Sequence, residues 1–485
     1  DEQTQHSRHP LRLDGRSGHG LGRASGSAYA EPRPAGAPGR RLHAQLLQQP
    51  PVRALAFQPG QRQVYAQNRR LEQLQGPEPD DPTLFGDAES AGYDVSKIGR
   101  RDYLSGAHSI GARLLAWTRS AGIDLPEKER PETILVPDGV RRVREPDWQA
   151  VDQAGRFFRD RREDRNPFFC WLGFTQPHPM NGYRTSSHYL ERIDPTNVTL
   201  PPHDPLDHPV CRLAGMGKHT FESPVEEEAL AMRRHYLAMV AEVDEMVGQV
   251  LADLEQAGLS ENTVVVFFSD HGDMQLEHRM WLKNSFYEAS ARVPLIFAGP
   301  GVEAQGVRNE LVSLIDLRPT FAELTGCTVP DTLDGRSLLP ALQGDELAPK
   351  PVVGQYHSNM MCTGGFMLRD GDWKYIAYAG YESQLFNLAE DPDELENRID
   401  ANPEQAAAMD RKLRSHIDIE HVDRLAKTED RQCFRAWRAA VSKEEYEQTL
   451  AKLWHGFGPE QLRKLDRWLQ QGESAVRDAG CHIHP

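Results

Sequence analysis

A short polar segment beginning at Asp270 follows the apolar run Thr263–Ser269, which is typical of a buried strand. Asp270 and His271 offer an oxygen and a nitrogen ligand to a cation, and sites rich in carboxylate oxygen suit Ca²⁺ or Mg²⁺. A bare Asp-His-Gly is more often an ordinary turn after a strand. Lys283 follows in the same stretch, however, and a lysine placed there can bind an anion at a metal. We therefore predict a metal site that receives an anionic ligand.

Two further strand ends carry residues of matching chemistry. His178 lies between two prolines after the run Phe168–Phe174, which predicts a strand buried on both faces. On this rigid turn it can donate a proton to a leaving oxygen, although a structural role explains it equally well. Arg100 follows the strand predicted over Tyr93–Gly99 and either lies in a solvated turn or holds a sulfate or phosphate oxygen. Together the three strand ends predict a site for an anionic ester.

The elements that must position these residues alternate between helices and strands. A helical stretch over Pro82–Gly92 precedes the first of the strands, and a long amphipathic helix over Val225–Ala257 precedes the strand before Asp270. A further strand is predicted over Val293–Phe297. This alternation predicts an α/β fold whose mostly parallel sheet has helices on both faces. Such sheets bind their ligands at the carboxyl ends of the strands.

The pattern changes near Gly354, which indicates a second structural unit. Short alternating runs predict a small antiparallel sheet over Phe366–Leu368, Trp373–Tyr378 and Gln384–Asn387. Charge-rich helical sequence fills Pro403–Gln471. We therefore expect a catalytic α/β domain over residues 77–350 and a smaller C-terminal α+β subdomain over residues 351–485.

Composition excludes several classes of protein. The chain has 485 residues, 39% of them hydrophobic, which is enough for a sizeable core. A net charge of −16 argues against a general nucleic-acid binder, and no apolar run approaches the roughly 20 residues that cross a bilayer. Six cysteines without a C-x-x-C pair exclude a zinc ribbon and a disulfide scaffold, and favour a chain without disulfides. These features are typical of a soluble, acidic protein.

The catalytic motifs resemble those of the sulfatases in the alkaline-phosphatase superfamily. The resemblance rests on Ser269–Gly272, Lys283, Tyr287-Glu288, Arg292-Val293-Pro294, Gly299-Pro300-Gly301, Gly99–Gly106, Ala116–Arg119, Glu277–Arg279, Trp373–Tyr378 and Asp391–Leu395. It extends from Pro79 to Leu469 and implies the alkaline-phosphatase-like fold. The implied activity is hydrolysis of sulfate esters, with sulfated sugars such as 2-O-sulfoglucuronate of glycosaminoglycans as substrates.

The same resemblance implies a ligand set for a divalent cation. Asp270 and His271 match its ligands, with Ca²⁺ the expected ion and Mg²⁺ or Mn²⁺ as alternatives. Asp1 resembles the acidic ligand that follows the first strand of the family. That strand is absent from the sequence, so we expect the chain to begin within the domain.

The resemblance also implies roles in binding the sulfate ester. Lys283 and His178 match the residues that bind sulfate and assist the leaving group. Arg100 stands where the family usually has lysine, which keeps the charge and changes the geometry. An enzyme that generates formylglycine, or its anaerobic counterpart, is the expected maturation partner of an intact gene.

The likeness fails at the nucleophile. The family oxidises a Cys or Ser in Cys/Ser-x-Pro-Ser-Arg to formylglycine, and no such sequence occurs in this chain. Residues 1–76 contain eleven arginines, no lysine and no isoleucine, a composition that also fits a disordered arm. We hypothesise that they are read in a shifted frame. One nucleotide later, codons exist for Gln45–Phe57 that yield Cys-Val-Pro-Ser-Arg, and shifts over Tyr29–Pro34 and Arg62–Glu72 yield further family sequences. On this hypothesis the chain as written lacks its nucleophile.

Other functions fit the same residues. A phosphonate-monoester or phosphodiester hydrolase of the same superfamily would use the same frame and metal. A catalytically dead relative would bind a sulfated sugar without releasing sulfate. A generic metal-binding protein is the last alternative, and it predicts that Lys283→Ala changes nothing but stability.

Overall fold

The computed structural model describes residues 83–100, 110–122, 132–161, 166–179, 182–202, 208–216, 225–328, 333–358, 360–453 and 458–470. The anomalous segment 1–76 lies outside these residues, and with it the candidate ligand Asp1 and the hypothesis of a shifted reading frame.

Within the described residues, the strands of the catalytic region form three hydrogen-bonded pairs. They are β1 (Asp94–Gly99) with β3 (Phe168–Gly173) and β2 (Thr133–Leu135) with β4 (Tyr183–Thr185), both parallel, and β5 (Val265–Phe268) with β6 (Leu295–Ala298), which is antiparallel. The predicted positions of β1, β3, β5 and β6 are confirmed to within a few residues. The direction of β6 departs from the parallel expectation, because an apolar run indicates burial and carries no information on strand direction.

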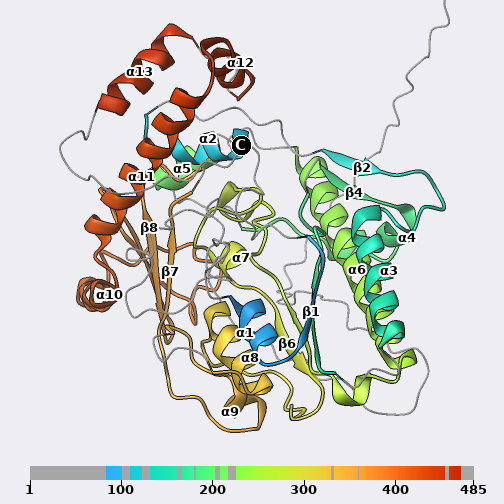
Figure 1. The fold of residues 1–485 in the computed structure, drawn as a ribbon. Helices are drawn as coiled ribbons and strands as arrows, with labels where there is room; N and C mark the ends of the chain where they lie inside the picture. The colour runs from blue at the N-terminus through green and yellow to red at the C-terminus, as the bar shows by residue number, and fades with distance from the viewer. Residues whose placement is uncertain are drawn as a thin grey trace, which may run out of the picture. The chain divides into compact units, whose positions relative to one another are not determined.

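Helices cover both faces of β1 and β3, as predicted (Figure 1). On one face lie α3 (Glu145–Asp160) and α6 (Glu226–Gln256), whose side chains pack with Phe168, Cys170 and Leu172 of β3. On the other face lie α1 (Leu84–Ser90) and α8 (Leu317–Thr325), which pack with Phe169 and Trp171. This alternation follows from the two-residue period of a strand.

Both faces of β3 are packed against helices, as predicted, but the strand is not completely buried. Every residue of Phe168–Gly173 is only half-buried, and the same holds for Val265–Phe268 of β5. Within the described ranges β3 is hydrogen-bonded to β1 alone, and β5 to β6 alone. An apolar run indicates that a strand is suited to a buried position. Here each of the two strands is paired along one edge only within the described residues, so its residues stay partly exposed.

The C-terminal region contains the predicted antiparallel sheet and one additional strand. Its order is β10 (Gln384–Asn387), β9 (Trp373–Tyr378), β8 (Gly365–Asp370) and β7 (Val352–Tyr356). Sequence analysis missed β7, whose Gly354 interrupts its alternating pattern. The predicted helical region holds α10 (Pro403–His416), α11 (Ile419–Ala440), α12 (Lys443–Leu453) and α13 (Pro459–Gln470).

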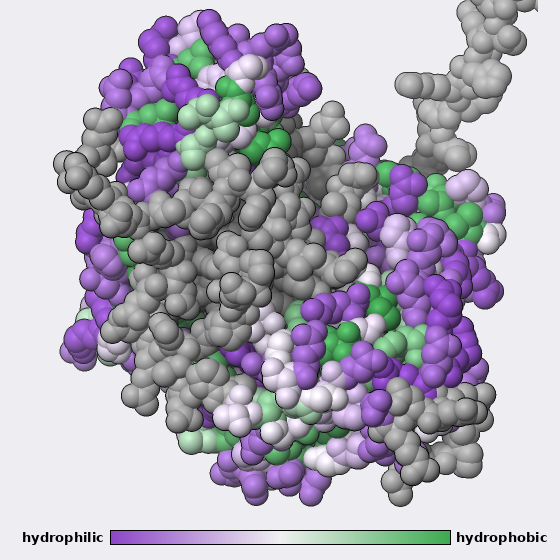
Figure 2. Space-filling view, in the orientation of Figure 1, coloured by the Kyte–Doolittle hydropathy of each residue, from purple (hydrophilic) through white to green (hydrophobic). Residues whose placement is uncertain are grey.

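The remaining helices are short. They are α2 (Ile110–Trp117), α4 (Ser187–Leu190), α5 (Pro209–Met216), α7 (Glu288–Ala291) and α9 (Leu339–Leu342). Polar side chains dominate much of the visible surface around α12 and α13 and around α3 and α4 (Figure 2). None of the helices in the described ranges combines the length and the apolar character that a membrane span requires.

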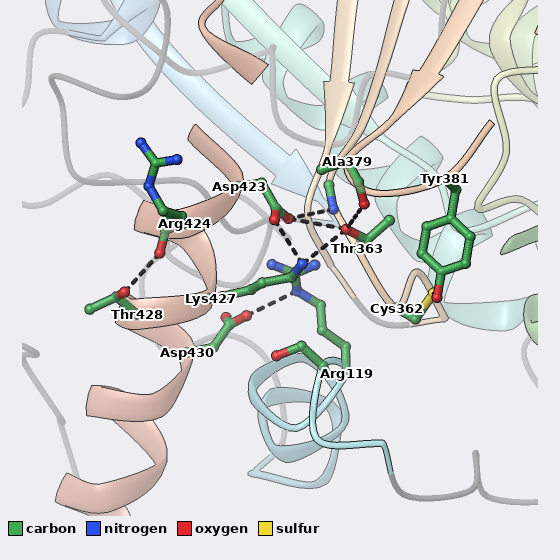
Figure 3. Close-up of polar contacts among 12 residues, drawn as sticks. Arg119, Cys362, Thr363, Ala379, Tyr381, Asp423, Arg424, Lys427, Thr428 and Asp430 are labelled. Atoms are coloured by element: carbon green, nitrogen blue, oxygen red, sulfur yellow. Dashed lines mark hydrogen bonds and ion pairs between the residues drawn. The ribbon is translucent and has the colours of Figure 1, made fainter. Parts of the chain in front are cut away.

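A buried group of charges joins the end of α2 to α11, and we call it the Arg119 network (Figure 3). Arg119 Nε donates to Asp430 Oδ2 at 2.9 Å, and its Nη1 donates to the carbonyl of Met361 at 3.4 Å. Lys427 Nζ donates to Asp423 Oδ2 at 2.7 Å and to Thr363 Oγ1 at 3.0 Å. The side chain of Arg119 is fully buried, so the network fixes residues distant in sequence.

The cysteines correct one expectation. Cys433 is disulfide-bonded, although the sequence favoured a chain without disulfides. Cys170, Cys211, Cys327 and Cys362 carry free thiols. Spacing alone could not reveal the bond, because a pairing between distant cysteines leaves no local motif.

Candidate functional site

The loop after β5 carries the predicted metal ligands Asp270 and His271. Ser269 Oγ donates to the carbonyl of His271 at 2.8 Å, and the amide of His271 donates to Asp270 Oδ1 at 3.1 Å. The next residue, Gly272, donates its amide to the carbonyl of Ser290 in α7 at 2.9 Å. Two local bonds and one longer contact thus hold the loop at the end of β5.

The two ligand side chains converge. His271 Nδ1 lies 2.8 Å from the carbonyl of Gly272, so Nδ1 donates its proton to that oxygen, and an unprotonated Nε2 would offer its lone pair to a cation. That Nε2 lies 3.4 Å from Asp270 Oδ2. A lone pair and a carboxylate at this separation repel one another unless a proton or a cation lies beside both. The arrangement therefore fits two ligands of one cation, with a carbonyl orienting the imidazole from its other side.

The described residues supply only part of a ligand set. Among them, no group of three or more His, Cys, Asp or Glu side chains is placed to hold a metal ion. Ca²⁺ takes six to eight oxygen ligands, so Asp270 and His271 must be joined by water or by residues outside the described ranges. The predicted contribution of Asp1 is therefore untested.

The turn that carries His178 is held by two buried acids. Asp147 Oδ2, in the first turn of α3, accepts the amides of Thr175 at 3.0 Å and of Gln176 at 2.8 Å. Gln176 Nε2 donates to Glu242 Oε2 of α6 at 2.9 Å. The peptide bond between Gln176 and Pro177 is cis. Long-range contacts to α3 and α6 thus set the position of His178.

Glu242 accepts hydrogen bonds from several of the residues around this turn. Its Oε1 accepts the amides of Val143 at 2.9 Å and Arg144 at 3.1 Å, and the indole Nε1 of Trp148 at 2.9 Å. Burial raises the pKa of its carboxyl group above the ordinary value, while these hydrogen bonds act in the opposite direction. Sequence analysis placed neither Asp147 nor Glu242. The available signal was an acid at position 242 inside the apolar face of a long helix.

The structure brings His178, Lys283 and His271 together. Lys283 Nζ lies 2.5 Å from His178 Nε2, so the ammonium donates to a neutral imidazole. The rings of His178 and His271 lie 5.9 Å apart, centroid to centroid. The predicted sulfate-binding pair therefore lies beside the predicted metal ligands, although the residues come from different loops.

Arg100 begins at the same end of the strands. Its amide donates to the carbonyl of Gly173 at 2.8 Å, directly after the register pair Gly99 and Gly173. The backbones are too close for side chains there: a Cβ on Gly99 would lie 2.2 Å from the Gly173 oxygen, and one on Gly173 would lie 2.4 Å from the Arg100 oxygen. The glycines therefore allow the two strand ends to meet beside the site. The role of the Arg100 guanidinium stays a prediction.

The segment after the metal loop has an unusual backbone. Positive φ angles occur at Gln275, Leu276, His278, Arg279, Leu282 and Asn284, none of which is glycine. Such angles cost energy and cluster at functional sites. Packing offsets that cost here: the His278 ring stacks on Tyr287 with centroids 3.5 Å apart, and Asn284 Nδ2 donates to Tyr356 Oη at 2.5 Å.

A second group of polar residues lies in this segment and was not predicted. Gln275 Nε2 donates to Tyr183 Oη at 2.9 Å and to Asp273 Oδ1 at 2.6 Å. Arg233 of α6 pairs with Glu277 at 3.0 Å and also donates to the carbonyl of Gln275. Burial raises the pKa of the Glu277 carboxyl to about 7. The sequence gives no local sign of these contacts, since they join three distant parts of the chain.

Solved structures with a similar fold include the phosphonate monoester hydrolase of Agrobacterium radiobacter. It has a TM-score of 0.60 and 22% sequence identity, and the match covers 77% of this chain and 87% of that one. A structure in complex with its substrate D-glucosamine-2-N,6-O-disulfate has a TM-score of 0.55 and 19% identity, and the match covers 80% of this chain and 90% of that one. At these identities the likeness establishes the fold, which is alkaline-phosphatase-like.

Sequence comparisons reach further. A model of the sulfatase family matches residues 60–327, and one of the N-sulphoglucosamine sulphohydrolase C-terminal region matches residues 276–422. Arylsulfatase K of Bos taurus is 33% identical over 433 residues, which is 83% of this chain and 80% of that protein. On this sequence identity and the match to more than half of its length, the chain belongs to the sulfatase family of hydrolases in the alkaline-phosphatase superfamily.

Proposed function

We propose that this site binds a sulfate ester of a sugar at a divalent cation held by Asp270 and His271. The observation that supports the proposal is the convergence of those two side chains with the Lys283–His178 pair at the ends of the strands. Relatives named arylsulfatase K, and a fold relative bound to a disulfated glucosamine, point to sulfated sugars as the substrate class. The expected substrate is a 2-O-sulfoglucuronate residue of a glycosaminoglycan.

The cation would be held by the His271 Nε2 lone pair and the Asp270 carboxylate. When bound, Ca²⁺ would act as a Lewis acid that polarises a sulfate oxygen and orients the ester. Asp270 is half exposed, whereas His271 is 8% exposed, so the histidine is the more rigid of the two ligands. Mg²⁺ and Mn²⁺ are the alternative ions.

The Lys283–His178 pair would act on the oxygen that leaves sulfur. Lys283 already donates to His178 Nε2, so the imidazole is oriented and the positive charge of the ammonium lies next to it. An incoming sulfate ester would receive hydrogen bonds from the ammonium. His178 Nε2 would take up the proton that Lys283 donates to it and deliver a proton to the departing alcohol oxygen, which leaves Lys283 neutral until it is reprotonated from solvent. Arg100 would bind the nonbridging oxygens from the neighbouring strand end.

Binding measurements test this proposal without requiring turnover. We would titrate the full chain with a disaccharide ending in 2-O-sulfoglucuronate, in the presence of Ca²⁺, by calorimetry. The sulfated disaccharide should bind, and its unsulfated counterpart should not. Loss of one charge-assisted contact in Lys283→Met should weaken binding roughly tenfold or more.

Lys412→Met is the matched control for this experiment. Lys412 lies in α10, is half exposed and pairs with Asp370 at 2.6 Å, so the variant loses the same charge away from the site. It should bind like the wild type. Equal affinity for the sulfated and unsulfated sugars, or equal losses in the two variants, would contradict the proposal.

The likeness to a phosphonate monoester hydrolase supports a second candidate, the hydrolysis of phosphonate monoesters or phosphodiesters. Competition separates the candidates: an aryl sulfate and an aryl phosphonate monoester would each displace the disaccharide. Stronger displacement by the phosphonate would favour this second function over the sulfatase.

The nucleophile has its own test. No Cys or Ser in this chain is followed by x-Pro-Ser-Arg. Resequencing the source DNA through codons 1–80 and translating all three frames would reveal a shifted Cys-Val-Pro-Ser-Arg. A correction of one base at each end of the segment would restore the motif and justify assays for formylglycine and sulfate release. Without the motif in any frame, the frameshift hypothesis is wrong and a catalytically dead sugar-sulfate binder becomes the expected function.

A further inference from the structure

A buried lysine of the C-terminal sheet, Lys374, contacts the first residue of α7. Lys374 of β9 has a side chain that is 1% exposed, and its Nζ lies 2.7 Å from Glu394 Oε1 and 2.7 Å from Glu288 Oε1. Two carboxylates thus share one ammonium: Glu394 is as buried as Lys374, whereas the Glu288 side chain is 21% exposed. A buried charge group of this kind is costly to assemble, and hydrophobic replacements are often no less stable. Stability alone is therefore a weak reason for its presence.

The second acid in this group holds the backbone of α7. Glu394 Oε2 accepts the amide of Glu288, the first residue of α7, at 2.5 Å. Glu394 itself has a positive φ of 55° and is 1% exposed, so its side chain is held in one place. Lys374 and Glu394 consequently fix both the side chain and the amide of Glu288.

From α7 the contact continues directly to the metal loop. The carbonyl of Ser290 accepts the amide of Gly272 at 2.9 Å. The approach is so close that a Cβ on Gly272 would lie 2.0 Å from the carbonyl oxygen of Ala289. Any shift of α7 must therefore move Gly272, which directly follows His271. No flexible side chain separates the two backbones.

We propose that Lys374 is a positioning residue for the metal loop and acts through Glu288, Glu394 and α7. The proposal rests on the proposed function only in taking Asp270 and His271 as metal ligands. Removing the ammonium leaves the buried Glu394 carboxylate facing the partly exposed Glu288 carboxylate, and their repulsion would displace α7 together with Gly272. Lys374 touches neither cation nor substrate in this scheme.

Hydrogen exchange and calcium titration of the full-length Lys374→Met variant test the proposal. Amides in residues 269–292 should exchange about tenfold faster than in the wild type, because local opening becomes easier. Calcium affinity should fall by about tenfold or more, which is typical when the support of a metal ligand is lost. Lys412→Met, which removes an exposed lysine that also contacts the C-terminal sheet through Asp370, should change neither quantity.

A double variant adds a readout that a general loss of stability would not produce. In Lys374→Met with Glu394→Gln, one of the two facing charges is gone and the amide oxygen can still accept from Glu288. Slow exchange over residues 269–292 should be partly restored. If Lys374→Met does not fold, Glu394→Ala alone decides: it removes the acceptor of the Glu288 amide, and it should accelerate exchange in 269–292 and leave β7 and β8 unchanged.

The outcomes separate the two proposals. A wild-type chain that fails to bind Ca²⁺ contradicts the metal site, while the exchange data still report on the role of Lys374. Exchange over residues 269–292 that is the same in Lys374→Met and Lys412→Met overturns the positioning role, whatever the chain does with calcium.

Discussion

The candidate site and the Arg119 network are built on opposite principles. At the site, residues 275–284 adopt several positive φ angles, Gly272 touches α7, and Lys283 donates to a neutral base. In the Arg119 network, each cation pairs with a carboxylate on α11: Arg119, just past the end of α2, with Asp430, and Lys427 with Asp423. The comparison indicates that the geometry of the site depends on the position of the backbone, whereas the network depends on ion pairs between buried or partly buried side chains. Substitutions in the two regions should therefore affect different properties.

The largest effect on stability is expected for Arg119→Met. At pH 8 the variant leaves the Asp430 carboxylate buried without its partner, and breaking a buried pair in this way costs about 3–5 kcal/mol. Urea unfolding measures the loss. Exchange over residues 269–292 should stay at the wild-type level if the two regions are independent. A rise there as large as in Lys374→Met would contradict the comparison.

Gly272→Ala should show the reverse combination. The added Cβ would meet the Ala289 oxygen at 2.0 Å, so α7 or the loop must shift, at a cost of roughly 1–3 kcal/mol. Calcium affinity, measured by calorimetry, should fall much more than this modest loss of stability suggests.

Gly248→Ala in α6 is the control for that substitution. Nothing lies within 4 Å of its Cβ position, so alanine should stabilise the helix by up to about 1 kcal/mol and leave calcium binding unchanged. Equal calcium affinities in Gly272→Ala and Gly248→Ala would show that the close approach of Gly272 to α7 does not affect calcium binding.

The pH dependence of the free energy of unfolding tests whether the buried carboxyl group of Asp430 titrates in the folded chain. Burial raises the pKa of Asp430 to about 7, an effect larger than the lowering by Arg119. Between about pH 4 and 7 the folded chain holds a proton that the unfolded chain has released, so this group's contribution to stability is lost as the pH rises. The slope is at most about 1.4 kcal/mol per pH unit.

Urea unfolding of the wild type and Asp430→Asn across pH 4.5–8 isolates that contribution. The asparagine variant should lack this component of the slope, and the cost of Arg119→Met should shrink at pH 5. Parallel curves for the wild type and Asp430→Asn would show that the carboxyl group does not titrate in this window.

The smallest effect is expected at the surface. Arg438 pairs with Asp466 at 2.9 Å, and both side chains are more than two-fifths exposed, so Arg438→Met should cost about 0.2–1 kcal/mol in urea unfolding. A loss as large as that of Arg119→Met would show that burial does not distinguish the two pairs.

The sequence was most informative where chemistry follows an apolar run. Asp270, His271 and His178 come directly after strands, and Lys283 lies a short way beyond, so strand positions alone placed them near one another. The charge-rich C-terminal helices and three strands of the small sheet were also predictable, because their periodicity is local.

Other features depend on contacts between distant segments. Asp147 and Glu242 hold the His178 turn from two different helices, and Lys374 reaches α7 from the C-terminal sheet. No window of sequence contains both partners of such a contact. An apolar run also carries no information on the direction of a strand such as β6, and the disulfide of Cys433 left no local motif.

The facing glycines at the ends of β1 and β3 have a consequence for evolution. Because each backbone occupies the space of the other's side chain, neither Gly99 nor Gly173 can vary without separating the strands. On the proposed function, a change in anion preference would involve position 100, where this chain has arginine, while the strand ends that present it stay the same. Close backbone packing thus fixes the residue type at both glycine positions.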